Sequence, residues 1–277
     1  MGLAAIPYHL TYIRHQLGQK LKLGDRPYRV RGYITNRLTT TATHEPHLVA
    51  ALARAMAARS GTVIDVGVNT GQTLQKILSI DAARHYVGFE PQVGCCFFVD
   101  QFLRDNKVRN ASVVSLALSN SNMLLPLYSE GQFDEMASLV ASTTSRYRAE
   151  SAVTYVPARI GDEVLREMSI DDPAIIKVDV EGAEISVFRG LSGTLAEKRP
   201  ICFFEVLPNY AGHDRVPIDV SLAERNRAAA ADLYAFFAEA GYRIHQIDQA
   251  GGEAPIDAFD LDRPDAFVGT DYVAHPA

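Results

Sequence analysis

Two short stretches contain the residue types most able to do chemistry in this sequence. The first, "TVIDVGVNTGQTL", covers residues 62–74, and the second, "IIKVDVEGAE", covers residues 175–184. In each, an apolar run typical of a buried strand reaches an aspartate, and glycine follows before a helix-like pattern begins. Glycine permits a tight turn and close approach of a ligand to the backbone, because it has no Cβ. Each stretch therefore predicts a ligand-binding turn at a strand end, with a purely structural glycine turn as the alternative.

The first stretch lacks both common phosphate-binding signatures. A dinucleotide loop requires Gly-x-Gly-x-x-Gly and a P-loop ends in Gly-Lys-Ser/Thr, whereas this loop reads G-V-N-T-G and continues with Gln72. Glu90 ends the next predicted strand, in "HYVGFEP", about twenty residues after Gly71, where an acid can bind the hydroxyls of a ribose. The loop and Glu90 together predict a nucleoside ligand without a phosphate chain.

Three closely spaced acids mark the second stretch: Asp179, Glu181 and Glu184. Their repulsion requires a cation, a partner or a helix N-terminus nearby, and Glu184 suits the helix N-terminus. In a doubly wound sheet the strand ending at Asp179 should lie beside strand 62–66, so that Asp179 projects into the same cleft. Asp179 and Glu181 are therefore candidates to orient an acceptor group and take its proton.

Further candidates lie close to these strand ends. Glu205 ends the strand "ICFFEV" and could share Mg²⁺ with Asp179, but paired acids are common without a metal, and we assign none. His213, in the loop "LPNYAGHDRVP", is either a base above the acceptor or an ordinary surface histidine. Lys177 could face the cleft or cover the sheet. Asp162 is interpreted as the N-cap of a short helix.

Predicted strands and helices alternate along most of the chain, as in βαβ units. The expected fold is α/β, a doubly wound, mostly parallel sheet with an antiparallel edge strand. We divide the chain into an N-terminal helical extension (1–45) and a Rossmann-like domain (46–277). The predicted strands are 62–66, 85–90, 111–118, 124–129, 154–158, 174–178, 201–206, 242–247 and 265–273, and the predicted helices are 45–61, 70–78, 92–106, 185–195 and 220–240.

Composition narrows the classes of partner. The net charge of −6 argues against broad nucleic-acid binding, and no apolar run reaches the ~18 residues of a membrane span. Three cysteines are too few for a disulfide framework. We expect a cytoplasmic protein without stable membrane insertion. Residues 1–31 form a predicted basic amphipathic helix with a turn at Gly24–Pro27. This segment could dock on an anionic membrane or an acidic partner, or pack across a homodimer.

The stretches "DVGVNTGQ", "FEP", "IIKVDVEGAEISVFRGL" and "PICFFEV" together resemble the FkbM-type methyltransferases, over roughly residues 62–206. The family's usual alanine before the loop asparagine is Val68 here. The resemblance implies a class I methyltransferase fold and S-adenosyl-L-methionine as the cofactor. It also implies a set of cofactor-binding residues: Asp65, Gly67, Asn69, Gly71, Glu90, Pro91, Ala117, Leu118 and Asp179.

The expected function is therefore S-adenosylmethionine-dependent O-methylation of a hydroxyl on a small molecule, such as a sugar or a natural-product intermediate. The candidate catalytic residues are Asp179, Glu181, Glu205 and His213. N-methylation of a small amine is an open alternative. An NAD- or nucleotide-sugar-binding oxidoreductase is disfavoured by the absent glycine motif and the absent Tyr-x-x-x-Lys pair. A non-catalytic interaction protein that has kept the cofactor fold is the third alternative.

Overall fold

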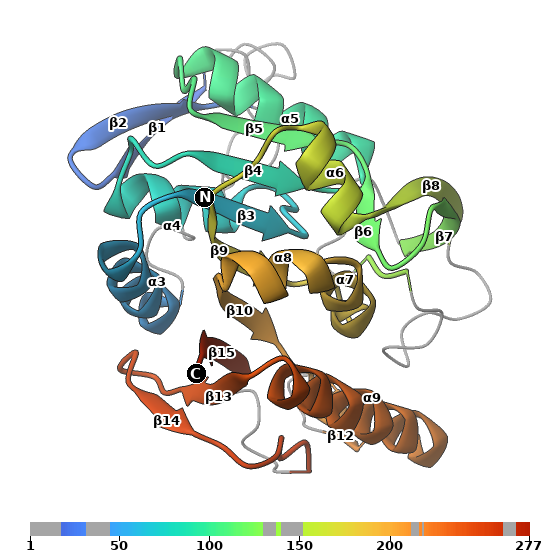
Figure 1. Ribbon diagram of the computed structural model, residues 1–277. Coiled ribbons are helices and arrows are strands. Elements are labelled where there is room, and N and C mark those ends of the chain that lie inside the picture. The colour runs from blue at the N-terminus through green and yellow to red at the C-terminus, as the bar shows by residue number, and fades with distance from the viewer. Residues whose placement is uncertain are drawn as a thin grey trace, which may run out of the picture.

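The parallel part of the main sheet carries the strand ends that the sequence singles out. The computed structural model describes residues 18–31, 45–129, 137–139, 152–211, 216–217, 219–262 and 270–277. Its main sheet has eight strands in the order β14-β13-β15-β10-β9-β3-β4-β5 (Figure 1). The parallel strands are β3 (Thr62–Val66), β4 (Tyr86–Phe89), β5 (Ala111–Val114), β9 (Pro173–Val178) and β10 (Ile201–Glu205).

The other side of the sheet is antiparallel. It consists of β13 (Tyr242–Ile247), β14 (Glu253–Pro255) and β15 (Asp271–Pro276), and β15 joins it to β10. The predicted doubly wound, mostly parallel α/β sheet is confirmed, and its antiparallel edge has three strands rather than one. Within the described ranges, none of the helices combines the length and the apolar character that a membrane span requires.

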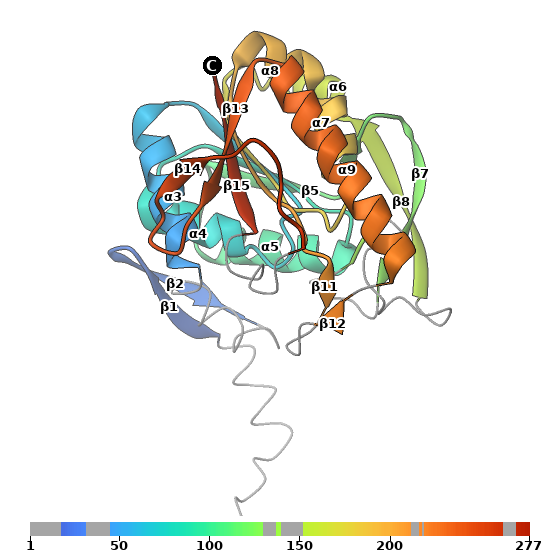
Figure 2. The same ribbon diagram turned by 90° about the horizontal axis from the view of Figure 1, so that it is seen from below.

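Helices cover both faces of this sheet (Figure 2). Side chains alternate along a strand, so β3 sends Val63 into one core cluster and Ile64 into the other. The first cluster lies under three helices: α3 (Pro46–Ala58), α4 (Gln72–Ile80) and α5 (Val93–Asp105). The second lies under four: α6 (Gly161–Glu167), α7 (Glu184–Gly190), α8 (Ser192–Lys198) and α9 (Val220–Glu239).

The predicted N-terminal helix is wrong for residues 19–30. These residues form a hairpin of β1 (Gln19–Leu23) and β2 (Arg26–Val30). Residues 1–17 and 32–44 of the predicted extension lie outside the described residues, and the division of the chain at residue 45 stays a prediction.

Apolar side chains at every second position explain the hairpin. Leu21, Leu23, Tyr28 and Val30 are buried in the first core cluster, while the residues between them are more exposed. A period of two is the pattern of a half-buried strand. The ring of Tyr28 stacks on Phe102 of α5, with ring centroids 5.7 Å apart. The hairpin is therefore attached to the same core as the main sheet.

A small second sheet closes one end of the fold. It contains β6 (Ala117–Ser119), β7 (Met123–Ser129) and β8 (Ala152–Ile160) in the order β6-β8-β7. The single strand predicted over 111–118 is wrong, because the chain leaves the main sheet after β5 and then pairs with β8 as β6. A separate two-stranded pairing joins β11 (Tyr210–Ala211) and β12 (Val216–Pro217).

Asp162 caps a helix other than the one predicted. Its carboxylate accepts hydrogen bonds from the backbone N–H groups of Gly193 and Thr194, at 2.7 and 2.9 Å, and from the Thr194 hydroxyl, at 2.6 Å. These groups belong to the first turn of α8, whereas Asp162 itself lies in α6. Since α8 follows α7 directly, the helix predicted over 185–195 is two helices, and Asp162 fixes the start of the second.

We predict that Asp162→Ala lowers the free energy of unfolding by about 1–2 kcal/mol, because three donors at the start of α8 lose their acceptor. Urea unfolding with an unchanged m-value would measure this change. Asp171→Ala, at an exposed position, is the control. Equal stability of Asp162→Ala and the wild-type protein would show that α8 does not depend on this cap.

Candidate functional site

A cavity of about 420 Å³ lies at the carboxyl ends of the parallel strands. This is the edge at which ligands bind in open α/β sheets, and the volume is within the range of small-molecule sites. Most of the predicted site residues line it: Gly67, Asn69, Glu90, Pro91, Ala117, Leu118, Asp179, Glu181 and Glu205. His213 lies outside the described residues.

The two glycine-bearing stretches meet at the floor of this cavity. Strands β3 and β9 are parallel neighbours, as the sequence predicts, and the Asp179 N–H donates to the Val66 carbonyl at 2.9 Å. Gly67 has φ +88°, and a Cβ there would lie 1.8 Å from the Asp179 carbonyl oxygen. Any side chain at position 67 would therefore separate the two loops.

Glu90 holds the first loop from the neighbouring strand. It is 3% exposed, and its carboxylate accepts the N–H of Asn69 at 2.8 Å and the N–H of Gln92 at 2.7 Å. Burial raises the pKa of Glu90 to about 7, against the lowering effect of these two hydrogen bonds. Glu90 thus fixes the loop backbone and also presents a carboxyl group to the cavity.

Asp65 and Gly71 are cofactor-binding candidates that do not line the cavity. Asp65 is fully buried and accepts a hydrogen bond from the Tyr86 hydroxyl, and its Oδ1 has no hydrogen-bond partner among the described residues. Burial raises the pKa of Asp65 to about 6, although the nearby Lys177 ammonium lowers it. Asp65 lies opposite Lys177 in the register of β3 and β9, and Lys177 lines the cavity, so Asp65 lies near the cavity without lining it.

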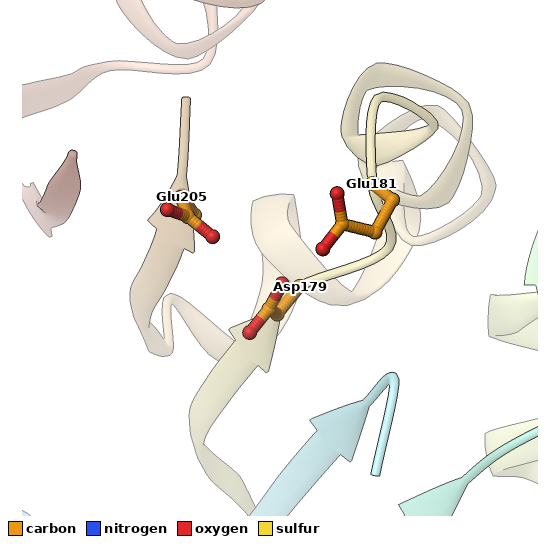
Figure 3. Close-up of side chains that lie close together, drawn as sticks. All are labelled: Asp179, Glu181 and Glu205. Atoms are coloured by element: carbon orange, nitrogen blue, oxygen red, sulfur yellow. The ribbon is translucent and has the colours of Figure 1, made fainter. Parts of the chain in front are cut away.

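Three carboxyl groups meet at the opposite end of the cavity from Glu90. Asp179, Glu181 and Glu205 each offer an oxygen, and these oxygens lie within 4.8 Å of one another. Figure 3 shows the three side chains converging from the end of β9, the following loop and the end of β10. Burial, with Asp179 close by, raises the pKa of Glu205 well above its ordinary value. Glu205 therefore holds its proton to a higher pH than an exposed glutamate does.

Lys177 compensates part of this negative charge. Its ammonium forms an ion pair with Asp179 at 2.8 Å. Burial would lower the pKa of Lys177, but the carboxylates of Asp179 and Asp65 outweigh it and raise that pKa. The side chain lines the cavity, which resolves the ambiguity left by the sequence in favour of the cleft. Three carboxyl groups of this kind can hold a hard cation, and here the Lys177 ammonium offsets part of their repulsion.

Apolar groups from three separate segments form the wall near Glu90. Pro91 follows β4, Leu118 lies in β6 and Leu127 lies in β7, and all three line the cavity. Ala137 and Leu139 also line the cavity, and the Ser138 hydroxyl between them donates to the Glu181 carbonyl at 2.8 Å, which ties this segment to the loop after β9. An apolar slot beside a carboxyl group suits a flat ring attached to a polyol.

Two ion pairs that involve cavity-lining residues were not predicted from the sequence. Lys76 of α4 lies 2.9 Å from Glu45, and both residues line the cavity. His47 lies 2.8 Å from Asp271, whose hydrogen bond raises the pKa of His47. The sequence did contain a signal for Lys76, because it follows Gln72 by one helical turn and therefore lies on the same face of α4. The partners Glu45 and Asp271 gave none, because each is distant in sequence from the residue that it binds.

Glu184 is the third acid of the second stretch, and it binds its own loop. Its Oε1 accepts the N–H groups of Gly182 at 3.1 Å and Val180 at 3.3 Å. Burial raises the pKa of Glu184 to about 7 from an ordinary value of 4.5. The structure therefore favours the predicted helix-start role for Glu184, and it does not line the cavity.

We predict that Glu184→Gln, which keeps the accepting oxygen, is more stable than the wild-type protein by about 1–3 kcal/mol at pH 8. The folded chain holds this proton to a higher pH than the unfolded chain, so the stabilisation is complete below pH 4.5 and is lost as pH rises through about 7. Unfolding curves from pH 4 to 8 would measure this, with the exposed Glu197→Gln as control. Parallel pH profiles of Glu184→Gln and the wild-type protein would contradict it.

Comparison with known proteins identifies the family. The model described as "Methyltransferase FkbM domain" matches residues 65–244, whereas no curated protein matches the chain. Among solved structures, the chain is similar to the methyltransferase FkbM from Methylobacillus flagellatus KT, with 16% identity and a TM-score of 0.48, covering 78% of this chain and 44% of that protein. This chain thus spans less than half the length of that relative.

Two further solved structures are similar at lower identity. The precorrin-6y C5,15-methyltransferase from Geobacter metallireducens GS-15 has 8% identity and a TM-score of 0.42, covering 83% of this chain and 88% of that one. The O-methyltransferase from Bacillus cereus, in complex with SAH, has 10% identity and a TM-score of 0.43, and the match covers 88% of this chain and 90% of that one. Since the family model spans well over half of the sequence, this chain belongs to the FkbM family of methyltransferases.

Proposed function

We propose that this chain transfers a methyl group from S-adenosylmethionine to a hydroxyl group of a small molecule. One observation carries the proposal: a single cavity joins the carboxyl group of Glu90, beside an apolar wall, to the carboxyl groups of Asp179 and Glu181. Membership of the FkbM family implies the use of S-adenosylmethionine. The acceptor would then lie at the Asp179 end.

The chemistry of the cavity is compatible with this cofactor. Glu90 suits the ribose hydroxyls, and Pro91 and Leu118 offer apolar contacts to an adenine ring. Gly67 and Asn69 line the cavity after β3, the strand between β9 and β4, where the amino-acid part would extend. Carboxylates at the far end favour the binding of a positively charged sulfonium. When bound, S-adenosylmethionine supplies an electrophilic methyl group.

The protein's own contribution would be to position the acceptor and to accept its proton. Asp179 is held by Lys177 at 2.8 Å, so its carboxylate is fixed in place to orient a hydroxyl group and take the proton. Glu205, whose burial favours the protonated form, would donate a hydrogen bond to a second oxygen of the acceptor. Glu181 completes a polar surface that suits a polyol such as a sugar.

Two alternatives remain distinguishable by experiment. An NAD-dependent oxidoreductase would need a dinucleotide loop, which the sequence lacks, and family membership favours methyl transfer. N-methylation of a small amine uses the same cofactor and differs only in the acceptor. We favour the hydroxyl group because the carboxyl groups at the Asp179 end offer both a proton acceptor and, in Glu205, a donor.

We predict that S-adenosylhomocysteine raises the melting temperature of the protein and that NAD does not, because a ligand stabilises the folded state it binds. Glu90→Ala should weaken S-adenosylhomocysteine binding roughly tenfold or more, since the buried carboxyl group is lost. Calorimetry would measure both, with the exposed Glu239→Ala as control. Stabilisation by NAD alone would exclude the methyltransferase proposal.

Asp179→Asn tests the acceptor end. The variant keeps the shape of the side chain but cannot take a proton, so turnover with a hydroxyl acceptor should fall about 10²–10⁴-fold. Binding of S-adenosylhomocysteine should stay within about threefold of the wild-type value. Asp100→Asn, which removes the acid of an exposed ion pair, is the matched control. Unchanged turnover in Asp179→Asn would rule out its catalytic role.

A further inference from the structure

Lys76 is a buried cation that faces the cavity from α4. Its side chain is 2% exposed and forms an ion pair with Glu45 at 2.9 Å. It lies one helical turn after Gln72 and Thr73, which also line the cavity. Long side chains on a helix point back towards its N-terminus, so the ammonium group lies near the start of α4 and the loop that precedes it.

The cavity has few cations with which to bind an anion. Among its lining residues in the described ranges, the cationic side chains are Lys76 and Lys177. Lys177 is close to Asp179, Asp65 and Asp271, which all act on its charge. By contrast, the carboxylate that forms an ion pair with Lys76 in the described part of the chain is Glu45, which is 37% exposed. Lys76 is therefore the cation whose partner can most easily be replaced by a ligand.

The backbone of Glu45 is in an unfavourable conformation. Its φ of 55° and ψ of 58° are left-handed, and it precedes Pro46, which further restricts it. It occupies the N-cap position of α3, but its side chain makes no capping hydrogen bond. Asn69 and Glu181, which also line the cavity, have positive φ values too. Such residues concentrate at ligand sites, and Glu45 itself lines the cavity.

We propose that Lys76 is a carboxylate-binding subsite, which exchanges Glu45 for the methionyl carboxylate of the cofactor. This inference rests on the proposed function. A carboxylate that leaves water requires a paired cation, and Lys76 lies beside the loop that the amino-acid part would follow. The released Glu45 can turn towards solvent, because it is already partly exposed. A carboxylate on the acceptor is the other possible source of the anion.

The test compares two ligands that differ only in this carboxylate: S-adenosylhomocysteine and decarboxylated S-adenosylhomocysteine. Calorimetry with the full chain should show that Lys76→Met weakens the binding of S-adenosylhomocysteine roughly tenfold to a hundredfold. Binding of the decarboxylated ligand should change less than threefold. The exposed Lys198→Met is the matched control and should leave both affinities unchanged.

Glu45→Gln provides a second measurement on the same subsite. Because Lys76 no longer has to leave an ionised partner, S-adenosylhomocysteine should bind a few times more tightly, with no change for the decarboxylated ligand. If Lys76→Met lowered the affinity for both ligands equally, the proposal would be overturned. An unchanged affinity for S-adenosylhomocysteine would also overturn it and would leave the acceptor as the source of the anion. If the wild-type protein bound neither ligand, the proposed function itself would fail.

Discussion

The close approach of two backbone segments, at Gly67 and Asp179, is the constraint on which the rest of the site depends. A single Cβ at position 67 would overlap the Asp179 carbonyl oxygen, so the two loops can share one floor only with glycine there. Parallel pairing of β3 and β9 brings the loops to the same edge. That contact joins the two loops that line the cavity, and the parallel pairing of β9 with β10 brings Glu205 to the same edge.

Charge within the fold is arranged around this contact. Lys177 and Asp179 form an ion pair on the strand next to the buried Asp65, while Lys76 and Glu45 form another in the same cavity. Buried charges are tolerated only when they are paired or carry a proton. The raised pKa values of Glu90 and Glu205 are in line with the second response, whereas the negative charge of Asp65 is compensated by the nearby Lys177 ammonium. The site is thus rich in carboxyl groups without carrying the full negative charge that their number suggests.

The two ends of the cavity have different chemistry, which is what a group-transfer enzyme with two ligands requires. Near Glu90 the wall is apolar and is completed by the small sheet, which suits a nucleoside. Near Asp179 the surface is polar and can both accept and donate protons. The family relationship establishes methyl transfer as the chemistry of its members, and the arrangement of these two ends supports a hydroxyl acceptor.

The sequence by itself determined the strand–loop–helix units around Gly67 and Asp179, because their apolar runs, glycines and acids are local patterns that span a few residues. It also placed Glu90 and Glu205 at strand ends. Only the tertiary structure decided that residues 19–30 form a hairpin on the core and that Lys76 pairs with Glu45. These outcomes depend on contacts between residues far apart in the chain, and the burial that stabilises them exists only once the sheet and its helices have assembled.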